Sequence, residues 1–595
     1  MHVTSTSMRK LLSLFAALAV AGCATPRVAG GGAQPVPVRI IAFNDFHGAL
    51  QPPRQSIAAG GPNGNEVRVP AGGAAYFASA VRQLRQGHAN TLTVAAGDLI
   101  SASPLISALY LDEPTILTMN RIGLDYSAVG NHEFDRGRAE LLRMQNGGCA
   151  QHTRRTPCAV DAAFPGARFR YLAANVRTED GNTLFPAYAI RRFGSGRRQV
   201  AIGIIGLVLR DARTLVSPDG VAGLTFEDEA DSINALVPRL KAEGADAIVV
   251  LIHQGIETTR RFDAEACPGQ TGDLPAILAR LDPRIDLVVA GHVHRASLCD
   301  YGRIDPGRPI LVTNAERNGE VLTAIDLSID PVAGRVVSRA ARQTIVQGEG
   351  YEGARGAVPL TDLYPRFQPD PEVAAIVSRY AAASASAFAR PIGRLRGRAL
   401  EAQIASGESV LGNLIADSYL AATRAPENGG AQIAFINETS VRADIVPAAN
   451  GDVNFGQLFT AQPFGNTLIV KSFTGAEIRA ILEQQFNSGP NTAARPIMLI
   501  PAAGFTFSYD VSRPAGQRIL EMRLNGRPLV ETQVYRVVMN SFLANGGDNF
   551  SLFRDGRDTV DHALVDLDAL ERYIAANSPL APPAPNRITR LGPPR

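Results

Sequence analysis

The sequence is poor in features that mark several common classes of protein. It contains no Trp, which carries no functional information, and only five Cys among 595 residues. Lys and Arg exceed Asp and Glu by three, and the excess falls to one without residues 1–22, which hold Arg9 and Lys10 but no acidic residue. Without a basic run, a sequence-independent grip on nucleic acid is not indicated. No apolar run is long enough to span a bilayer, so we expect no integral membrane segment.

The composition that remains is that of an ordinary globular protein, with 45% hydrophobic and 19% charged residues. A single core stops growing beyond about 250–300 residues, so this length predicts two large domains. The expected segments are, in order, a signal peptide (1–22), a flexible tether (23–37), a first domain (38–346), a linker with a helix (347–390), a second domain (391–558) and a C-terminal helix with a Pro-rich tail (559–595).

The first residues have the pattern of an export signal. Arg9-Lys10 precedes the apolar stretch Leu11–Ala21, which is too short to span a bilayer. The residues that follow resemble a bacterial lipobox, in which Cys23 carries lipid and becomes the mature N-terminus. We therefore expect an exported protein, lipid-anchored in the periplasm or cell envelope, and Ala24 favours the outer membrane. The alternative is an ordinary signal peptide with an incidental cysteine.

The remaining four cysteines form an even set, which suits an oxidising compartment. Of the three possible connectivities, the least entangled joins Cys149 to Cys158 and Cys267 to Cys299. The second bond would staple the loops around His292 and its neighbours. The alternative is four unpaired thiols in a reducing cell, which the export signal disfavours.

Five short apolar runs each end in polar residues of the kind that bind metals. The runs are Val38–Phe43, Thr91–Ala95, Ser127–Val129, Ala247–Ile252 and Ile285–Ala290. They read as buried strands of an α/β sheet, and reactive groups in such sheets gather beyond the carboxyl ends of the strands. Any one of these clusters alone is weak, because a lone histidine is more often a core residue than a ligand. Together they deliver seven ligand-type side chains to one edge: Asp45, His47, Asp98, Asn131, His253, His292 and His294.

This ligand set predicts a dinuclear metal site. Two divalent cations about 3.5–4 Å apart can clamp the attacking and leaving oxygens of a phosphoryl displacement, and they lower the pKa of a coordinated water. Asp98 is the expected bridge, because it stands alone between the two halves of the set. One half is Asp45, His47 and His294, and the other is Asn131, His253 and His292. Mixed nitrogen and oxygen ligands suit Zn, Mn, Co or Fe without choosing among them.

His132 and Asp135 remain outside the ligand set, and their spacing predicts a separate catalytic role. His132 follows the ligand Asn131 and can reach the substrate without occupying a metal. Asp135 can accept the other ring proton of His132 and favour its charged form. We expect His132 to stabilise the transferring phosphoryl group or to protonate the leaving oxygen.

These clusters, in this order, resemble the signature of calcineurin-like metallophosphoesterases. The longer segments Phe43–Gly48, Gly130–Asp135 and Asn545–Asp548 are similar to those of the secreted, two-domain 5′-nucleotidase family. The resemblance extends from about Val38 to about Phe553. It implies an α/β fold with an N-terminal four-layer α/β/β/α sandwich, followed by an α+β substrate-binding domain. It also implies the same metal and dyad roles.

For the second domain, the resemblance alone supplies the expected site residues. It implies that Arg442 grips the substrate, that Asn437 touches the base, and that Phe464 and Phe542 stack on the two faces of the base. Aromatic stacking contributes roughly 1–3 kcal/mol per base with little sequence preference. It further implies a role for the Asn545–Asp548 segment, in which Asp548 holds ribose hydroxyls.

The sequence departs from the family pattern in two places. Glu438-Thr439-Ser440 stands where family members usually carry glycines. An arginine often found a few residues before Gly412 is missing, and Ile404–Gly407 stands there instead, with Arg396 and Arg398 out of register. With one fewer cation for the phosphate, affinity or specificity is expected to shift.

The expected function is metal-dependent hydrolysis of 5′-nucleotides to nucleosides and phosphate. The alternatives on the same metal site are a 2′,3′-cyclic-nucleotide phosphodiesterase and a nucleotide-sugar pyrophosphatase. A related sulfur-oxidising hydrolase branch shares the fold, but two base-stacking phenylalanines argue against it. The non-enzymatic alternative is a surface lipoprotein that binds nucleotides, which loss of a metal ligand would favour; none is lost. The sequence does not indicate an oligomeric state.

Overall fold

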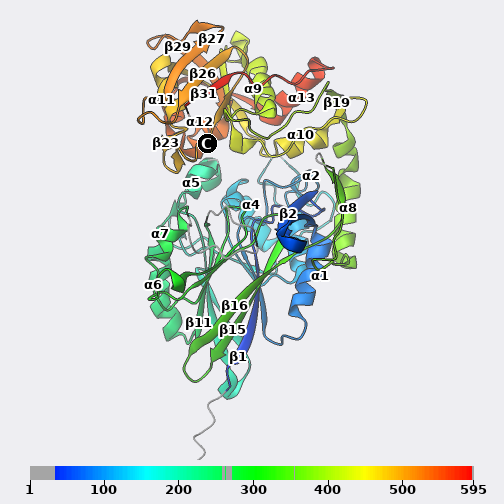
Figure 1. Cartoon of the computed structure of the whole chain (residues 1–595), viewed down its shortest axis with the longest axis vertical. Helices are drawn as coiled ribbons and strands as arrows, with labels where there is room; N and C mark the ends of the chain where they lie inside the picture. Colours follow the sequence, from blue (N-terminus) through cyan, green and yellow to red (C-terminus); the bar gives the residue numbers. More distant parts are fainter. Residues whose placement is uncertain are drawn as a thin grey trace, which may run out of the picture.

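The protein folds into two lobes joined along one side by a long helix (Figure 1). The computed structural model describes residues 34–592 except 154, 217, 257–261, 263–270 and 354–355. The lower lobe in Figure 1 contains the N-terminal half of the chain, and the upper lobe contains residues from about 390 onward. Each lobe has its own hydrophobic cores, as the length of the chain predicts.

The N-terminal domain contains two six-stranded sheets. The first has the order β16 (Arg335–Ile345), β15 (Val321–Asp330), β1 (Val36–Phe43), β4 (Thr91–Ala96), β5 (Tyr126–Ala128), β6 (Arg170–Leu172). The second has the order β13 (Ser297–Asp300), β14 (Leu311–Asn314), β12 (Leu287–Ala290), β11 (Ala247–His253), β9 (Val200–Val208), β8 (Tyr188–Phe193). The central strands of each sheet are parallel, so their carboxyl ends share one edge.

The two sheets pack face to face, and helices cover their outer faces. The residues of β11 explain why the run is apolar at every position. Val249 and Leu251 belong to the core between the sheets, whereas Val250 and Ile252 belong to the core beneath the helices. A strand buried on both faces has no solvent side on which to place polar residues.

The helices complete a four-layer α/β/β/α sandwich, as expected. Helices over the first sheet are α1 (Ala74–Arg85), α3 (Glu113–Ile122) and α4 (Arg138–Asn146). Helices over the second sheet are α6 (Glu229–Ala242) and α7 (Leu274–Leu278).

The C-terminal domain is α+β. Its five-stranded sheet has the order β25 (Leu499–Pro501), β20 (Ile433–Asn437), β29 (Val534–Asn540), β22 (Thr467–Thr474), β30 (Arg557–Val565). One face packs against α9 (Val410–Thr423) and α13 (Asp566–Ala576). The other face packs against α11 (Gly475–Glu483) and a smaller sheet of order β28 (Arg527–Pro528), β27 (Ile519–Leu524), β26 (Phe505–Asp510), β31 (Ile588–Leu591). Most of β30, and all of α13 and β31, come from the segment after residue 558, which packs on this domain.

Helix α8 (Pro371–Ala389) lies within the expected linker segment and joins the lobes. Asp370 caps its first turn by accepting from the backbone N–H of Glu372 and of Val373, which fixes where the helix begins. The helix contacts α1, α3 and α2 (Leu105–Ala108) of the first domain and α10 (Phe455–Ala461) of the second. Leu105 and Ala108 also belong to a core that lies mostly in the C-terminal domain, so the lobes share apolar packing.

The predicted disulfide between Cys149 and Cys158 is present. Cys299 is also disulfide-bonded. Its predicted partner Cys267 and the predicted lipidation site Cys23 lie outside the described residues. Within the described part of the chain, no helix has the length and apolar character needed to cross a membrane.

Candidate metal centre

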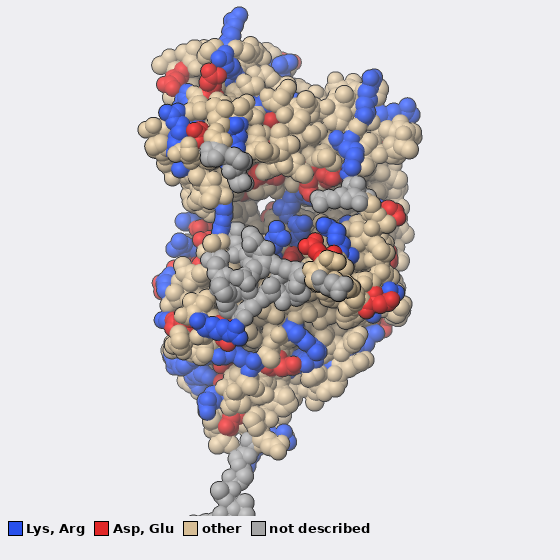
Figure 2. Space-filling view, in the orientation of Figure 1, with Lys and Arg blue, Asp and Glu red and all other residues tan. Residues whose placement is uncertain are grey.

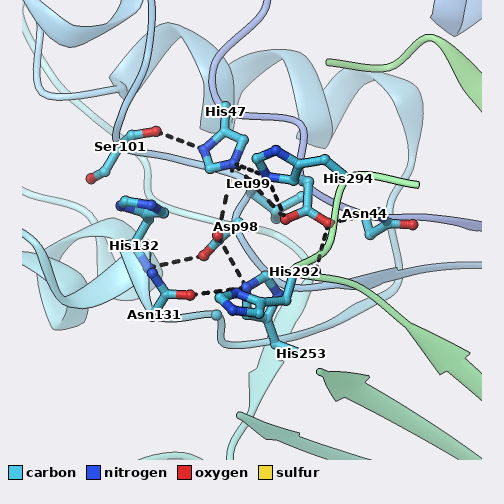
Figure 3. A network of polar contacts seen from close by, with 12 residues as sticks. Asn44, His47, Asp98, Leu99, Ser101, Asn131, His132, His253, His292 and His294 are labelled. Carbon is cyan, nitrogen blue, oxygen red and sulfur yellow. Dashed lines mark hydrogen bonds and ion pairs between the residues drawn. The ribbon is translucent and has the colours of Figure 1, made fainter. Parts of the chain in front are cut away.

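The seven predicted metal ligands all lie at strand ends on one edge of the sandwich. Asp45 and His47 follow β1, Asp98 follows β4, and Asn131 follows β5 in the first sheet. His253 ends β11, and His292 and His294 follow β12 in the second sheet. Figure 3 shows the side chains converging from the two sheets. The fold therefore brings together residues that lie far apart in the chain.

The ligand atoms form two overlapping groups. One group contains Asp45, His47 and His294, and the other contains Asp45, Asp98 and His253. In the first, His294 Nε2 lies 3.2 Å from His47 Nε2 and 3.3 Å from Asp45 Oδ1. In the second, His253 Nε2 lies 3.0 Å from Asp98 Oδ2. Within each group the atoms lie within 4.8 Å of one another, which is the spacing of donors around a shared cation.

Two further predicted ligands lie beside the second group. His253 Nε2 is 3.1 Å from the amide Oδ1 of Asn131. The ring of His292 lies edge-on to that of His253, with the ring centroids 5.2 Å apart. Asp98 reaches toward both groups, because its Oδ2 is also 3.8 Å from His47 Nε2.

The donors fit divalent metal ions. Asp45 Oδ1 is buried and has no hydrogen-bond partner, which is costly for a carboxylate oxygen unless a cation satisfies it. Two imidazoles are oriented by backbone carbonyls: His47 Nδ1 lies 3.0 Å from Ser101 O, and His253 Nδ1 lies 2.7 Å from Ala96 O. A proton on each Nδ1 leaves the Nε2 lone pair facing the centre, as in metal-bound histidines.

Most ligands have a backbone conformation that residues other than glycine rarely adopt. The φ angles are positive at Asp45 (50°), His47 (47°), Asp98 (51°), His292 (73°) and His294 (54°). Each such residue costs on the order of 1–3 kcal/mol, and surrounding contacts must offset the cost. The centre is therefore held by the fold and is not a relaxed surface cluster.

Asn44 is a supporting residue to which the sequence analysis gave no role. It donates to Asp45 Oδ2 over 2.6 Å and to the carbonyl of Glu316 over 2.9 Å, and it accepts from the N–H of Ala315 over 2.7 Å. The backbone N–H of His292 donates to the same Asp45 oxygen over 2.9 Å. Asn44 thus ties the loop after β1 to the loop after β14. The only feature of the sequence that could have pointed to this role is the position of Asn44 directly before the predicted ligand Asp45.

Glu133 is a second residue without an assigned role. Its buried carboxylate accepts from the backbone N–H groups of Asp98 (2.8 Å), Leu99 (2.8 Å) and Gly130 (2.6 Å). It therefore joins the loop after β4, which carries Asp98, to the loop after β5, which carries Asn131. The feature of the sequence that could have pointed to this role is the position of Glu133 within the Gly130–Asp135 motif.

Close approach of these two loops requires glycine at position 130. A Cβ atom built on Gly130 would lie 2.2 Å from Asp98 Oδ1 and 2.6 Å from the Asp98 backbone nitrogen. Any larger residue would push the two loops apart, and with them Asp98 and Asn131.

His132 and Asp135 form the predicted pair. His132 Nδ1 lies 2.7 Å from Asp135 Oδ2, and the His132 backbone N–H donates to Asp98 Oδ1 over 2.9 Å. Burial alone would lower the pKa of His132, but the negative charges of Asp135 and Asp98 outweigh it and raise that pKa. The imidazole is thus prepared to carry a proton at the edge of the metal centre.

The C-terminal domain reaches into this centre. The ring of Phe464 lies nearly parallel to that of His132, at 15° with centroids 6.0 Å apart. The Arg442 guanidinium lies 5.6 Å from the centroid of the same phenylalanine ring. Two of the predicted substrate residues therefore face the predicted catalytic histidine across the domain boundary.

Phe542 lies in the short helix α12 (Ser541–Ala544), close to Gly547, where an added Cβ would approach its ring to 2.5 Å. Among the described rings, Phe464 and Phe542 make no direct contact. Asn545 is exposed, and its carbonyl accepts from Arg554.

Asn437 and Asp548 bond to each other. Asn437 Nδ2 donates to Asp548 Oδ2 over 2.7 Å, and the Thr439 hydroxyl donates to the same oxygen. Thr439 belongs to the segment that replaces the family glycines. Its hydroxyl therefore occupies an acceptor that the resemblance assigns to ribose.

Comparisons with known proteins agree with this fold and site. The family described as calcineurin-like phosphoesterase matches residues 38–296, and the family described as 5′-nucleotidase, C-terminal domain, matches residues 391–555. The endonuclease YhcR of Bacillus subtilis is 28% identical over 93% of this chain, and the chain spans only 41% of that protein. A 5′-nucleotidase of Diplobatis ommata is 24% identical over 98% of this chain and 93% of its own length.

A solved structure gives the same result. The 5′-nucleotidase precursor from Thermus thermophilus superimposes with a TM-score of 0.69 at 25% identity, covering 94% of this chain and 100% of that one. Since both domains match in order and the fold is shared along the chain, this protein belongs to the two-domain 5′-nucleotidase family, in which a calcineurin-like phosphoesterase domain precedes a 5′-nucleotidase C-terminal domain.

Proposed function

We propose that the protein is a metal-dependent phosphoesterase that hydrolyses 5′-nucleotides to nucleosides and phosphate. The observation that carries this proposal is the convergence of seven ligand-type side chains from two sheets on one edge, with Arg442 and Phe464 of the second domain facing them. The family and the nucleotidase names of similar proteins support the substrate class.

We infer a dinuclear centre. Asp45, His47 and His294 would hold one ion, and Asn131, His253 and His292 the other. Asp98 would bridge them, which its position near both His253 and His47 supports. Two bound divalent ions would polarise the phosphoryl oxygens and lower the pKa of the attacking water. Glu133 and Asn44 keep the ligand loops in place.

His132 is placed to act on the substrate and not on a metal. Asp135 holds its Nδ1, so the opposite ring nitrogen is free to donate a proton to the transferring phosphoryl group or to the leaving oxygen. Phe464 stacks on this imidazole and would shield that face of the ring from water. A base entering beside Phe464 would place its phosphate between His132 and Arg442.

A second candidate is hydrolysis of 2′,3′-cyclic nucleotides or of nucleotide sugars such as UDP-glucose. The contact between Thr439 and Asp548 favours the cyclic nucleotide, because the acceptor expected to hold ribose hydroxyls is already bonded and a 2′,3′-cyclic phosphate leaves neither of those hydroxyls free. The non-enzymatic alternative is nucleotide binding at the cell surface without turnover. We also propose export and lipidation at Cys23; a disulfide at Cys149–Cys158 suits an oxidising compartment.

The test is phosphate release by the purified mature protein with added Mn²⁺ or Co²⁺, and with chelator as control. The panel contains AMP, ADP, UDP-glucose, 2′,3′-cyclic AMP and 4-nitrophenyl phosphate, with an added phosphatase to reveal phosphomonoester products. Preference for AMP is the expected result. Preference for the cyclic or sugar nucleotide would move the function to the second candidate, and absence of turnover with metals bound would favour the binding role.

Two variants test the roles within the site. Asp98→Ala should remove metal and turnover together, because it removes the bridge. His132→Ala should keep the metal content and lose turnover by about 10²–10⁴-fold, the usual contribution of general acid catalysis. Retained activity in Asp98→Ala would contradict the dinuclear assignment.

A further inference from the structure

Asp112 is a buried carboxylate to which no role has been assigned. It ends a segment that begins at Ser101, contains α2 and leads from the loop after β4 into α3. Asp112 is completely buried and has a positive φ angle of 63°. Burial of a charge and an unfavourable backbone conformation both cost free energy, so the contacts that offset this cost indicate what the residue does.

The carboxylate of Asp112 fixes the backbone of Ser101. Its Oδ2 accepts from the Ser101 N–H over 3.1 Å and from the guanidinium of Arg136, and its Oδ1 accepts from the hydroxyl of Ser107 over 2.6 Å. Ser101 and Ala102 have φ angles of 65° and 46°. Two consecutive residues with positive φ form a strained turn, which surrounding contacts must hold in place. Asp112 supplies such a contact at the first of them.

The carbonyl of Ser101 in turn holds the ring of His47. It lies 3.0 Å from His47 Nδ1, and Figure 3 shows this contact at the edge of the centre. A ring that donates its Nδ1 proton to this carbonyl presents the Nε2 lone pair to the proposed ion. The Ser103 hydroxyl donates to the same carbonyl over 3.2 Å. Asp112 therefore acts on His47 through a single intervening residue.

The same segment packs against the backbone that carries His47. A Cβ atom built on Gly48 would lie 2.5 Å from the Ser103 hydroxyl oxygen. On its other side, Leu105 and Ala108 of α2 belong to a core that lies mostly in the C-terminal domain. The segment thus lies between one metal ligand and the second domain, and packing restrains it from both sides.

The support that Asp112 gives differs from that of Glu133. Glu133 binds the loops that carry Asp98 and Asn131, which are the proposed bridge and a proposed ligand of one ion. The contacts of Asp112 lead instead to His47, a proposed ligand of the other ion. The two carboxylates therefore support different parts of the centre.

We propose that Asp112 is a positioning residue for His47 and thereby sets the affinity of one of the two metal ions. This inference rests on the proposed dinuclear centre. Removal of the carboxylate frees the strained turn at Ser101, and His47 then loses the partner that fixes its ring. The ion on the His47 side should bind more weakly, while the ion on the His253 side keeps all of its ligands.

The experiment titrates Mn²⁺ into the chelator-stripped mature protein by calorimetry, for wild type, Asp112→Ala, Asp112→Asn and Asp370→Ala. Asp370 is the matched control, because it is also a buried aspartate that accepts from backbone N–H groups and pairs with an arginine, Arg82. It caps α8, and among the described contacts it binds no loop that carries a proposed ligand.

The centre can be loaded and stripped in the folded protein. The His294 side chain is 22% exposed, and Figure 2 shows an opening between the two lobes. Electron paramagnetic resonance at limiting and at excess Mn²⁺ then separates a spin-coupled pair of ions from an isolated ion. Circular dichroism confirms that each variant is folded.

We expect Asp112→Ala to weaken one ion by about 10- to 100-fold and the other by less than about 3-fold, the effect of losing an outer partner of a metal ligand. At limiting Mn²⁺ the isolated-ion signal should then dominate. Asp112→Asn should recover most of the affinity, because its amide oxygen can accept from the Ser101 N–H while its NH₂ group donates to the Ser107 hydroxyl. Asp370→Ala should bind both ions as wild type does, even where it lowers Tm.

Double variants identify the ion that is affected. His47→Ala removes a ligand of one ion, so adding Asp112→Ala to it should weaken metal binding no further, because the carboxylate acts through the ring that is gone. Adding Asp112→Ala to His253→Ala should still weaken the ion that remains.

Four results would overturn the positioning role: equal weakening of both ions in Asp112→Ala, unchanged affinity for both, an equal loss in Asp370→Ala, or an undiminished further loss when Asp112→Ala is added to His47→Ala. If Asp112→Ala does not fold, Ser107→Ala decides. It removes one hydrogen bond from the carboxylate and should weaken the same single ion, so wild-type affinities in Ser107→Ala would refute the role.

Failure of the underlying proposals is separable from failure of this one. If wild type binds two ions but hydrolyses no nucleotide, the proposed substrate class falls, and the affinities still decide the role of Asp112. If wild type binds only one ion, the dinuclear centre falls. The positioning role then requires Asp112→Ala to weaken that ion by about 10-fold or more relative to Asp370→Ala, and equal affinities would refute it.

Discussion

At the scale of single residues, the metal centre depends on side chains that bind backbone as much as on those that face the metals. Glu133 is the main example, because one carboxylate accepts three N–H groups from two ligand loops. Such supporting contacts fix ligand geometry and typically tune metal affinity by about 10–100-fold. Loss of such a contact should therefore lower metal affinity even where the protein still folds.

Glu133→Gln tests this point. The amide keeps one acceptor but turns an NH₂ group toward backbone donors, leaving at least one of them without a partner, at a cost of about 1–3 kcal/mol. We expect metal affinity to fall by about 10–100-fold, measured by competition with a chromophoric chelator. Glu179→Gln, at an exposed position, is the control. Unchanged affinity in Glu133→Gln would show that the loops hold their positions without this carboxylate.

Asp566 gives a pH-dependent prediction remote from the metals. It is fully buried in the first turn of α13, and burial raises its pKa from 3.8 to about 7. The folded state therefore holds the proton more tightly than the unfolded state. The stabilisation is complete below about pH 3.8 and is lost as pH rises to about 7, a difference of about 4 kcal/mol at most.

Asp566→Asn should remove this dependence. The amide stays neutral at every pH, so the unfolding free energy at about pH 8 should rise relative to wild type, while that at about pH 4 changes little. Denaturant unfolding across this range is the measurement. Glu427→Gln, at an exposed position of the same domain, should leave the wild-type slope intact. Parallel curves for Asp566→Asn and wild type would show that Asp566 does not hold the proton.

At the scale of elements, the strands that end in ligands were predictable and their local geometry was not. A strand such as β11, buried on both faces, must be apolar throughout, so its end is visible in the sequence. The positive φ angles of Asp45 and Asp98 could not be predicted in the same way, because aspartate is enriched at positive φ but most aspartates still have negative φ. The hydrogen bond from Thr439 to Asp548 could not be predicted from the sequence either, because the two residues are 109 positions apart.

The loop after α12, which carries the proposed substrate residues Asn545 and Asp548, depends on one buried lysine. Lys471 of β22 donates to the carbonyls of Ala544 and Phe553, each over 2.9 Å, at the two ends of the segment that carries Asn545 and Asp548. Lys471→Met keeps the aliphatic stem and removes both bonds. We expect KM for the nucleotide to rise several-fold, while hydrolysis of 4-nitrophenyl phosphate stays unchanged, because that substrate does not need the loop.

The matched control is Lys241→Met in α6 of the other domain. Lys241 likewise donates to a backbone carbonyl, that of Asp246, but it lies far from the loop after α12 in the sequence. It should leave both KM values at their wild-type levels. Equal losses on both substrates in Lys471→Met would place the effect in general stability and not in the loop. A circular dichroism melting curve separates these cases.

At the scale of the whole molecule, the sequence predicted two domains but not how they meet. Contacts such as Phe464 on His132 join residues from different domains and follow from the relative placement of the lobes, which no local pattern encodes. The family resemblance supplied the partners of the site but not their contacts in this chain.

The division of the cores predicts how the molecule responds to metal. All proposed ligands lie in the N-terminal domain. One core of the C-terminal domain contains no residue of that domain, and the other includes only Leu105 and Ala108 from it. Metal present at about 100 times its Kd stabilises the domain that binds it by about 2.7 kcal/mol. Scanning calorimetry should therefore show two unfolding transitions. The transition of the N-terminal domain should lie at a higher temperature with Mn²⁺ than with chelator, and the other should not move. A single transition that shifts as a unit would mean that the shared packing at Leu105 and Ala108 couples the lobes fully.

The positive φ angles of the proposed metal ligands have a consequence for engineering this protein. Glycine relieves positive φ, so a screen for thermal tolerance that is carried out in the presence of a chelator would favour glycine at Asp45, Asp98 and His294. Each of those substitutions would remove a proposed metal ligand. The positions at which glycine raises thermal tolerance would then mark the proposed metal centre without any assay of substrate. A variant selected in this way would be inactive and would suit crystallisation with bound nucleotides.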